Sequence, residues 1–215
     1  MHRQILFSIA CLTFIGTTTG CLHGTRSVAM SEPNFSMTRT ISNEPLAIRE
    51  ITDDRVFEDG SPNASTPSVR GGLDGSTSEQ RARLIGRQRN GYGMAMGDID
   101  LPNERTVRDE VRDLVSRGVS ERGYALSDSS ATRMDIEIQK FWAWMQPGVW
   151  SVSFNSEIRT KLRIGTSEGT KEITVEGRGE NKGQGASDAN WALAFQRAYD
   201  DYLKNLESAL AELGL

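Results

Sequence analysis

A long alternating run in the second half of the chain limits the possible fold more than any other feature. From Trp150 to Ile164, six of the eight even-numbered positions are apolar and all seven odd-numbered positions are polar. Because successive side chains of a β-strand point to opposite faces, the run predicts a long strand with one buried and one solvated face. Such strands are typical of antiparallel sheets that are covered on one side.

The preceding segment predicts the partner strand of a hairpin. Apolar and polar residues alternate around Ile136, and the Gln-Pro-Gly sequence within 145–149 indicates a turn. We expect Trp144 to pair with Trp150 and Ile136 with Ile158, which places all four side chains on the buried face.

Two further strands are expected, at 46–52 and at 173–175. Gly177 and Gly179 follow the second of these, and we expect them to weaken its end, because glycine offers no side chain to pack.

Two segments have apolar residues at helical spacing, each behind a residue that can cap a helix, Thr106 or Ser187. The first apolar stripe is Val107, Val111, Leu114, Val115 and Val119, and the second is Trp191, Phe195, Ala198, Tyr199, Tyr202, Leu206, Ala209, Leu210 and Leu213. The order β-α-β-β-β-α predicts a two-layer α+β fold: an antiparallel sheet of three to four strands with two amphipathic helices on one face.

The first 21 residues have the composition of an export signal: a positive start, an apolar run over 5–15, and small residues before Cys21. The apolar run is shorter than the roughly 20 residues that a membrane span needs. Thr18-Thr19-Gly20-Cys21 resembles the lipobox of bacterial lipoproteins, with Thr18 in place of the usual Leu or Val. This resemblance implies that Cys21 is acylated after cleavage, and that Leu22 directs the protein to the outer membrane. A plain secretory signal cut elsewhere is the alternative.

The chain therefore divides into a signal peptide at 1–20, a lipidated N-terminus and flexible tether at 21–43, and one α+β domain at 44–215. The domain has a long polar loop at about 53–98, and we expect its first part, 53–80, to be disordered.

All histidine and cysteine residues, which are His2, Cys11, Cys21 and His23, lie in the first 23 positions. The rest of the chain therefore contains no Ser-His-Asp triad, Cys-His pair or zinc site of Cys and His ligands. The formal net charge of −4 argues against nucleic acid as a partner. We expect no cofactor.

Four aromatic residues near the predicted hairpin turn are candidates for contact with a partner, a glycan or a membrane. They are Phe141, Trp142, Trp144 and Trp150. For the three tryptophans, packing in the core is the alternative. Phe141 lies on the polar face of the alternation, so we expect it to be exposed unless a β-bulge at Lys140 turns it inward.

Two other motifs carry little information. The Gly91-Tyr92-Gly93 triplet resembles nucleotide-binding loops but lacks their strand and helix, so a glycine-permitted turn with one aromatic anchor is favoured. Asp98, Asp100 and Glu104 are close in sequence, and we expect them to be solvated carboxylates rather than a hydrolytic pair.

The chain resembles the small YajG-like bacterial lipoproteins. The likeness lies in the lipobox, in Glu121-Arg122-Gly123-Tyr124 before a strand, in the Ile136-Glu137-Ile138 strand with its long hairpin, and in the closing amphipathic helix. The resemblance implies an envelope lipoprotein with no established reaction and supplies no catalytic residue.

The sequence thus favours a non-enzymatic outer-membrane lipoprotein that faces the periplasm and serves as an assembly or interaction component of the cell envelope. Its expected partners are the membrane, through the acyl chains on Cys21, and an unidentified envelope protein. A module that binds lipid or peptidoglycan fragments is the alternative, and a carboxylate-dependent hydrolase is a third hypothesis.

Overall fold

A computed structural model describes residues 24–39, 44–60, 62–90, 92, 94–167 and 169–215. The expected signal peptide and its lipidation site, Cys21, lie outside these residues.

The fold is α+β, with more strands than the sequence predicts. The elements in chain order are β1 (Arg26–Ser27), β2 (Pro45–Asp53), α1 (Ser78–Arg83), β3 (Leu84–Arg89), β4 (Ala95–Asp100), α2 (Val107–Arg122), β5 (Ala125–Leu126), β6 (Arg133–Pro147), β7 (Val152–Thr166), β8 (Gly169–Gly183) and α3 (Asp188–Glu212). The eight strands form a mixed sheet, because β2 and β3 pair with β6 in parallel while β6, β7 and β8 are antiparallel to one another.

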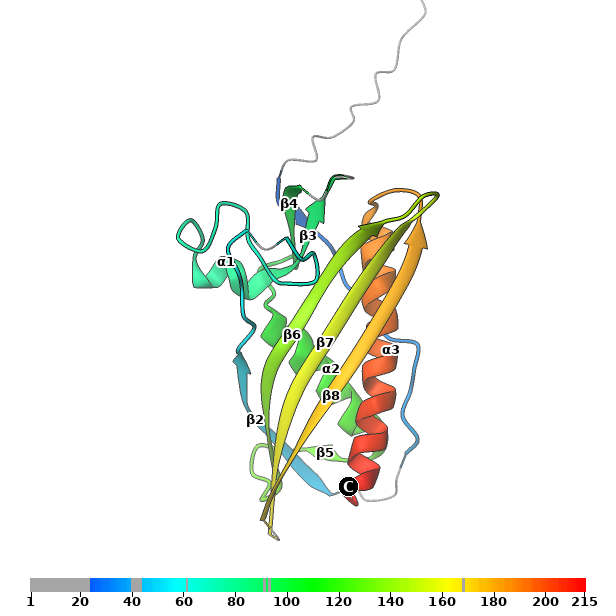
Figure 1. Ribbon diagram of the computed structural model, residues 1–215. Coiled ribbons are helices and arrows are strands. Elements are labelled where there is room, and N and C mark those ends of the chain that lie inside the picture. The colour runs from blue at the N-terminus through cyan, green and yellow to red at the C-terminus, as the bar shows by residue number, and fades with distance from the viewer. Residues whose placement is uncertain (1–23, 40–43, 61, 91, 93, 168) are drawn as a thin grey trace, which may run out of the picture.

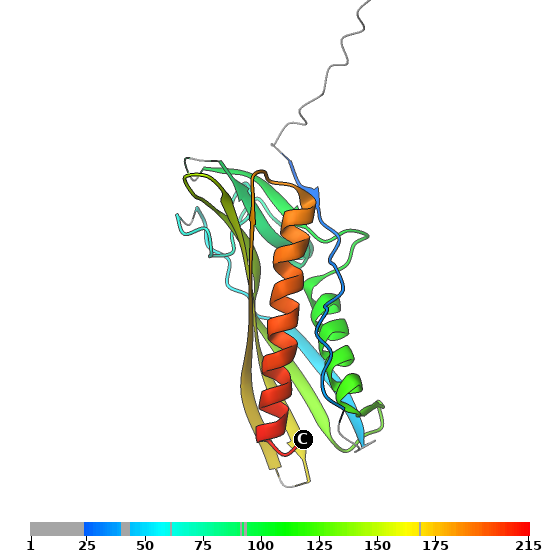
Figure 2. The same cartoon turned by 90° about the vertical axis from the view of Figure 1, so that its right-hand side faces the viewer.

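Three long strands, β6, β7 and β8, form the body of the sheet, and α3 lies along one face of them with α2 beside it (Figures 1 and 2). The alternation predicted for β7 is confirmed from Phe154 to Ile164, where every even position is buried. At the start of the predicted run it is wrong, since Val152 is half-buried and Trp150 is exposed before the strand begins. The two polar residues among the buried even positions bond to α3: the Ser156 hydroxyl donates to the Ala194 carbonyl at 2.8 Å, and the Thr160 hydroxyl lies 2.6 Å from that of Tyr202.

The predicted hairpin register is wrong. Trp144 lies opposite Asn155 rather than Trp150, and Ile136 lies opposite Leu162. β6 continues to Pro147 and β7 begins only at Val152, so the turn falls at 148–151 rather than within 145–149. There the Gly148 amide donates to the Ser151 carbonyl at 2.8 Å.

A β-bulge in β6 reverses the faces of its second half. The register shifts between Ile138 and Lys140, so Phe141 points inward like Ile138 and is fully buried. The expectation that Phe141 is exposed is therefore wrong, because one extra residue on the bulged strand changes the parity of every position that follows. Trp142 and Trp144 consequently lie on the outer face, away from α3.

Two glycines allow the close approach of β8 and α3. A Cβ atom at Gly177 would lie 2.3 Å from the Ala198 carbonyl oxygen, and one at Gly179 would lie 2.0 Å from that of Ala194. Both positions are buried within the strand. The expectation that these glycines weaken the end of the strand is therefore wrong. They allow the helix backbone to approach the sheet closely.

The long polar stretch after β2 is folded rather than disordered in its described residues. Residues 54–77 form a loop over the outer face of β6, and α1, β3 and β4 follow it within the range expected to be a loop (Figure 1). Arg55 holds the loop, because its buried guanidinium donates to the carbonyl oxygens of Leu84 at 2.5 Å and Phe141 at 3.2 Å. Asp53 balances its charge at 2.7 Å.

Candidate functional site

The segment expected to be a flexible tether is bound to the domain in its described part. Residues 24–39, called the strap below, run along α2 and α3 (Figure 2). β1 pairs with β4 in parallel, with Arg26 opposite Ile99. Val28 and Met37 are buried in the main core. The strap is mostly polar, but its few apolar side chains fill a groove between the two helices. This packing is enough to fix the strap on the domain.

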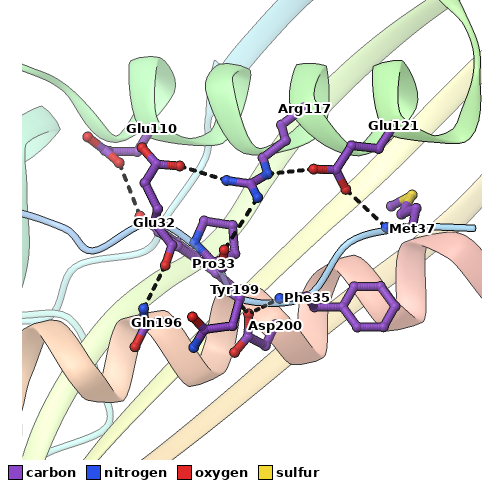
Figure 3. Close-up of polar contacts among 11 residues, drawn as sticks. Glu32, Pro33, Phe35, Met37, Glu110, Arg117, Glu121, Gln196, Tyr199 and Asp200 are labelled. Atoms are coloured by element: carbon purple, nitrogen blue, oxygen red, sulfur yellow. Dashed lines mark hydrogen bonds and ion pairs between the residues drawn. The ribbon is translucent and has the colours of Figure 1, made fainter.

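The α2 side of the strap is held by charged side chains (Figure 3). Arg117 forms ion pairs with Glu32 at 2.7 Å and with Glu121 at 2.8 Å. Glu121 also accepts a hydrogen bond from the Met37 amide at 3.0 Å. Together these contacts tie two points of the strap to one face of α2.

On the α3 side, side chains of the helix form hydrogen bonds with backbone groups of the strap. Asp200 accepts hydrogen bonds from the amides of Asn34 at 2.6 Å and Phe35 at 2.8 Å. The side-chain amide of Gln196 donates to the backbone carbonyl of Glu32 at 2.7 Å (Figure 3). Because hydrogen bonds to charged groups are shorter and stronger than neutral ones, the Asp200 carboxylate is a strong point of attachment.

A cavity of about 360 Å³ lies between the strap and the two helices. Its lining combines apolar and charged groups, among them Met30, Pro33, Arg105, Glu110, Leu114 and Tyr199. A cavity of this size and mixed lining has room for a small ligand or for an acyl chain segment.

The charged groups of this cavity satisfy one another. Arg105 lies 2.6 Å from both Glu110 and Asp113, and these hydrogen bonds raise the pKa of its guanidinium. The Tyr199 hydroxyl donates to Glu110 at 3.1 Å, and burial, followed by the charge of Glu110, raises the pKa of the phenol well above its usual value. Tyr199 is therefore a neutral hydrogen-bond donor at physiological pH.

The predicted aromatic group does not come together as one surface. Trp142 is buried beneath the 54–77 loop, where its indole N–H donates to the Ala64 carbonyl at 3.2 Å and its ring meets Phe57 edge-on at 5.9 Å. Trp144 is half-buried beside it, with the Lys140 ammonium 5.5 Å from its ring centre. Trp150 is 91% exposed at the tip of the β6–β7 hairpin.

Phe141 belongs to the core instead. Its ring stacks on Phe195 of α3 with centroids 5.0 Å apart, and Tyr199 lies 6.2 Å away. Of the four residues proposed for contact, Trp150 and part of Trp144 are thus accessible in this structure.

Of the three carboxylates expected to be solvated, Asp98 and Asp100 are engaged in the fold, whereas Glu104 is exposed. Asp98 is buried, accepts a hydrogen bond from the Arg70 amide at 3.1 Å and lies 3.7 Å from Arg87. Burial raises its pKa, although Arg70 and Arg87 act in the opposite direction. Asp100 pairs with Arg83 at 3.3 Å. Asp98 thus helps to fasten the 54–77 loop to the sheet.

Sequence reasoning missed the strap, the cavity and a second exposed tip. Tyr92 and Met94, in the β3–β4 hairpin, are 91% and 60% exposed. The glycines around Tyr92 were the signal for a turn, but nothing in the sequence placed this turn near Trp150.

The structure thus defines a class of α+β protein in which a segment before the domain, residues 24–39, is packed against the two long helices. The sequence profile of a family described as uncharacterized lipoprotein matches residues 80–208, and the chain belongs to this family. Membership implies anchoring to a membrane through acyl chains. No curated protein matches the chain.

Several solved structures are similar in shape. A protein from Xanthomonas campestris, of a family designated DUF330, has 14% identity and a TM-score of 0.45, covering 88% of this chain and 96% of its own. A hypothetical protein from Chlamydia trachomatis has 9% identity and a TM-score of 0.42, covering 80% and 99%. A putative neuraminyllactose-binding hemagglutinin homolog from Helicobacter pylori has 9% identity and a TM-score of 0.32, covering 84% and 92%.

No helix among the residues that the structure describes is long and apolar enough to cross a membrane.

Proposed function

We propose that this lipoprotein is a YajG-like, non-enzymatic component of the outer membrane that faces the periplasm and acts through contact with other envelope components. Its anchor is the set of acyl chains on Cys21. The observation that carries the proposal is the strap, which begins three positions after that cysteine and is bound along both helices. A rigid strap holds the domain at a fixed distance from its anchor, as a scaffold requires.

The anchor is tested by substitution of each cysteine in the full-length chain. We expect Cys21→Ser to abolish incorporation of labelled palmitate and to release the protein from membranes, since no thiol remains at the cleavage site. Cys11→Ser is the matched control, because this residue lies inside the signal and leaves with it. After separation of the two membranes by density, the wild-type chain is expected in the outer one. Palmitate on the Cys21→Ser protein would contradict the proposal.

The protein partner is expected on the outer face of the sheet, near Trp144. A shallow pocket there is lined by Trp144, Asn155, Glu157 and Arg178, which combine an aromatic surface with charges of both signs. A photo-crosslinking residue at Trp144 should trap discrete protein adducts in cells. The same residue at Lys204, an exposed position on α3, serves as the control.

The cavity beneath the strap supports a second candidate function, the binding of lipid or peptidoglycan fragments. Leu114 and Met30 offer it an apolar wall, and the Arg105 group, which is already paired with Glu110 and Asp113, offers it a polar edge. A crosslinking residue at Leu114 that traps lipid or muropeptide, with no protein adduct from Trp144, would favour this function over the first.

A further inference from the structure

Exposed apolar side chains gather at one end of the molecule. Six large apolar side chains are strongly exposed among the described residues, and four of them lie on two hairpin tips. These tips are Tyr92 and Met94 between β3 and β4, and Val149 and Trp150 between β6 and β7. Tyr92, Val149 and Trp150 each expose about nine-tenths of their surface. Burying them elsewhere would release water from a large apolar area.

The pairing of β3 with β6 brings the two tips to the same end. The strands are parallel, with Gly86 opposite Ala143, so both run toward that end (Figure 1). β6 continues for four more residues to Pro147, which at a rise of about 3.3 Å per residue carries its tip roughly 13 Å beyond this level. β3 runs beside it to Arg89, so the two tips project side by side (Figure 2).

The N-terminus enters the domain from the same end. Arg26 pairs with Ile99, and Ile99 pairs with Gly86, so β1 lies at the level where the two tips begin to project. Cys21 precedes Arg26 by five residues. Five residues reach at most about 17 Å, which is close to the height of the tips above β1. The chain between Arg26 and Cys21 is therefore long enough for the lipid anchor to reach the plane of the exposed tips.

The composition of the two tips suits a membrane surface. Neither 90–97 nor 141–156 contains a charged residue, although Asp, Glu, Lys and Arg make up 25% of the chain. Tryptophan and tyrosine favour the boundary between lipid headgroups and acyl chains, because their rings are apolar and their N–H and O–H groups still reach water. A charge at this boundary would add a desolvation cost that these tips avoid.

We infer that both tips insert into the headgroup region of the membrane that holds the acyl chains of Cys21. The inference rests on the proposed lipid anchor. The domain then has three points of contact with the membrane, which are the anchor and the two tips. Its opposite end, at the β7–β8 turn, is directed away from the membrane (Figure 1). The lipid holds the protein at the membrane, and the tips fix its orientation.

The test uses the full-length, lipidated protein with one new thiol. The signal removes Cys11 and acylation consumes Cys21, so Trp150→Cys supplies a single thiol for an environment-sensitive fluorophore. Ser167→Cys, exposed in the β7–β8 turn, is the matched control. Both are reconstituted in liposomes of phosphatidylethanolamine and phosphatidylglycerol that contain nitroxide-labelled phospholipid. We expect a blue-shifted emission and severalfold quenching at position 150, and neither effect at position 167.

The possible failures are distinguishable by flotation of the liposomes. Protein that floats but shows equal, weak quenching at both positions would overturn the inference and leave the lipid anchor intact. A blue shift at position 150 without nitroxide quenching would also overturn it, and would indicate that a second copy of the chain covers the tips. Protein that does not float would overturn the proposed anchor itself, and the membrane contact of the tips with it.

Discussion

The two faces of β6 are covered in different ways, although they belong to the same strand. On the inner face, Phe141 is packed against Phe195 in one continuous core that includes both long helices. On the outer face, Trp142 belongs to a small separate cluster under the 54–77 loop. Further along the outer face of β6, ion pairs such as that of Glu137 with Arg163 of β7 replace apolar packing. The difference indicates that the inner face determines global stability, whereas the outer face is stabilised locally and remains open to partners.

The largest effect is expected for Phe141→Ala. Removing a buried aromatic ring from the inner face leaves a cavity, and should lower the free energy of unfolding by about 3–5 kcal/mol. Trp144→Ala, at a half-buried site on the outer face, is the control and should cost clearly less. Urea denaturation of both variants measures the contrast. Equal losses would remove the distinction between the faces.

A smaller loss is expected when β8 and α3 are forced apart. A methyl group at Gly179 meets the backbone of Ala194, which has no free rotamer by which to yield, so Gly179→Ala should cost about 1–3 kcal/mol. Gly185→Ala, with no atom within 4 Å of the added Cβ, is the matched control and should leave stability almost unchanged. Thermal unfolding of the two proteins is sufficient to compare them, and a harmless Gly179→Ala would contradict the close approach seen here.

The loop on the outer face should respond locally rather than globally. Trp142→Phe removes the hydrogen bond to the Ala64 carbonyl, at a net cost of about 0.5–1.5 kcal/mol. We expect faster hydrogen exchange in residues 62–73, with little change in β7 and α3. Faster exchange spread evenly over the domain would show instead that the two clusters unfold as one unit.

The smallest effect is expected for the ion pairs of the outer face. Arg163 lies 2.8 Å from Glu172 and 3.5 Å from Glu137, and its side chain is half-exposed. Arg163→Gln should cost less than about 1 kcal/mol, and the difference from wild type should shrink as salt is added, because salt screens exposed charges. A difference that is independent of salt would point to packing by the arginine stem rather than to charge.

The sequence was informative where apolar side chains follow one face of an element without interruption. It was misleading where one extra residue reverses which side chains face the core. The pattern of β7 is regular, so the strand and its buried positions could be predicted. The bulge after Ile138 could be raised only as an alternative, because the local sequence allows Lys140 and Phe141 to lie on either face of the strand. The parallel neighbours β2 and β3 depend on pairing over long distances, which no local pattern encodes.

The candidate site was even less accessible to sequence reasoning. The strap and the 54–77 loop are polar in composition, and they are ordered by specific contacts, Asp200 with backbone amides and Arg55 with carbonyl oxygens. Such contacts leave no periodic signature. Tyr92 and Trp150 were both visible as residues near turns, but only the pairing of β3 with β6 shows that they share one end.

The strap also makes the attachment of the first described residues depend on a helix that lies far along the chain. Its partners on α3 lie 162 to 169 positions later in the chain. The strap therefore closes only when the C-terminal helix is in place, since contacts so distant in sequence form after the local ones. Removal of α3 would therefore free the strap, and with it the link between the proposed lipid anchor on Cys21 and the body of the domain.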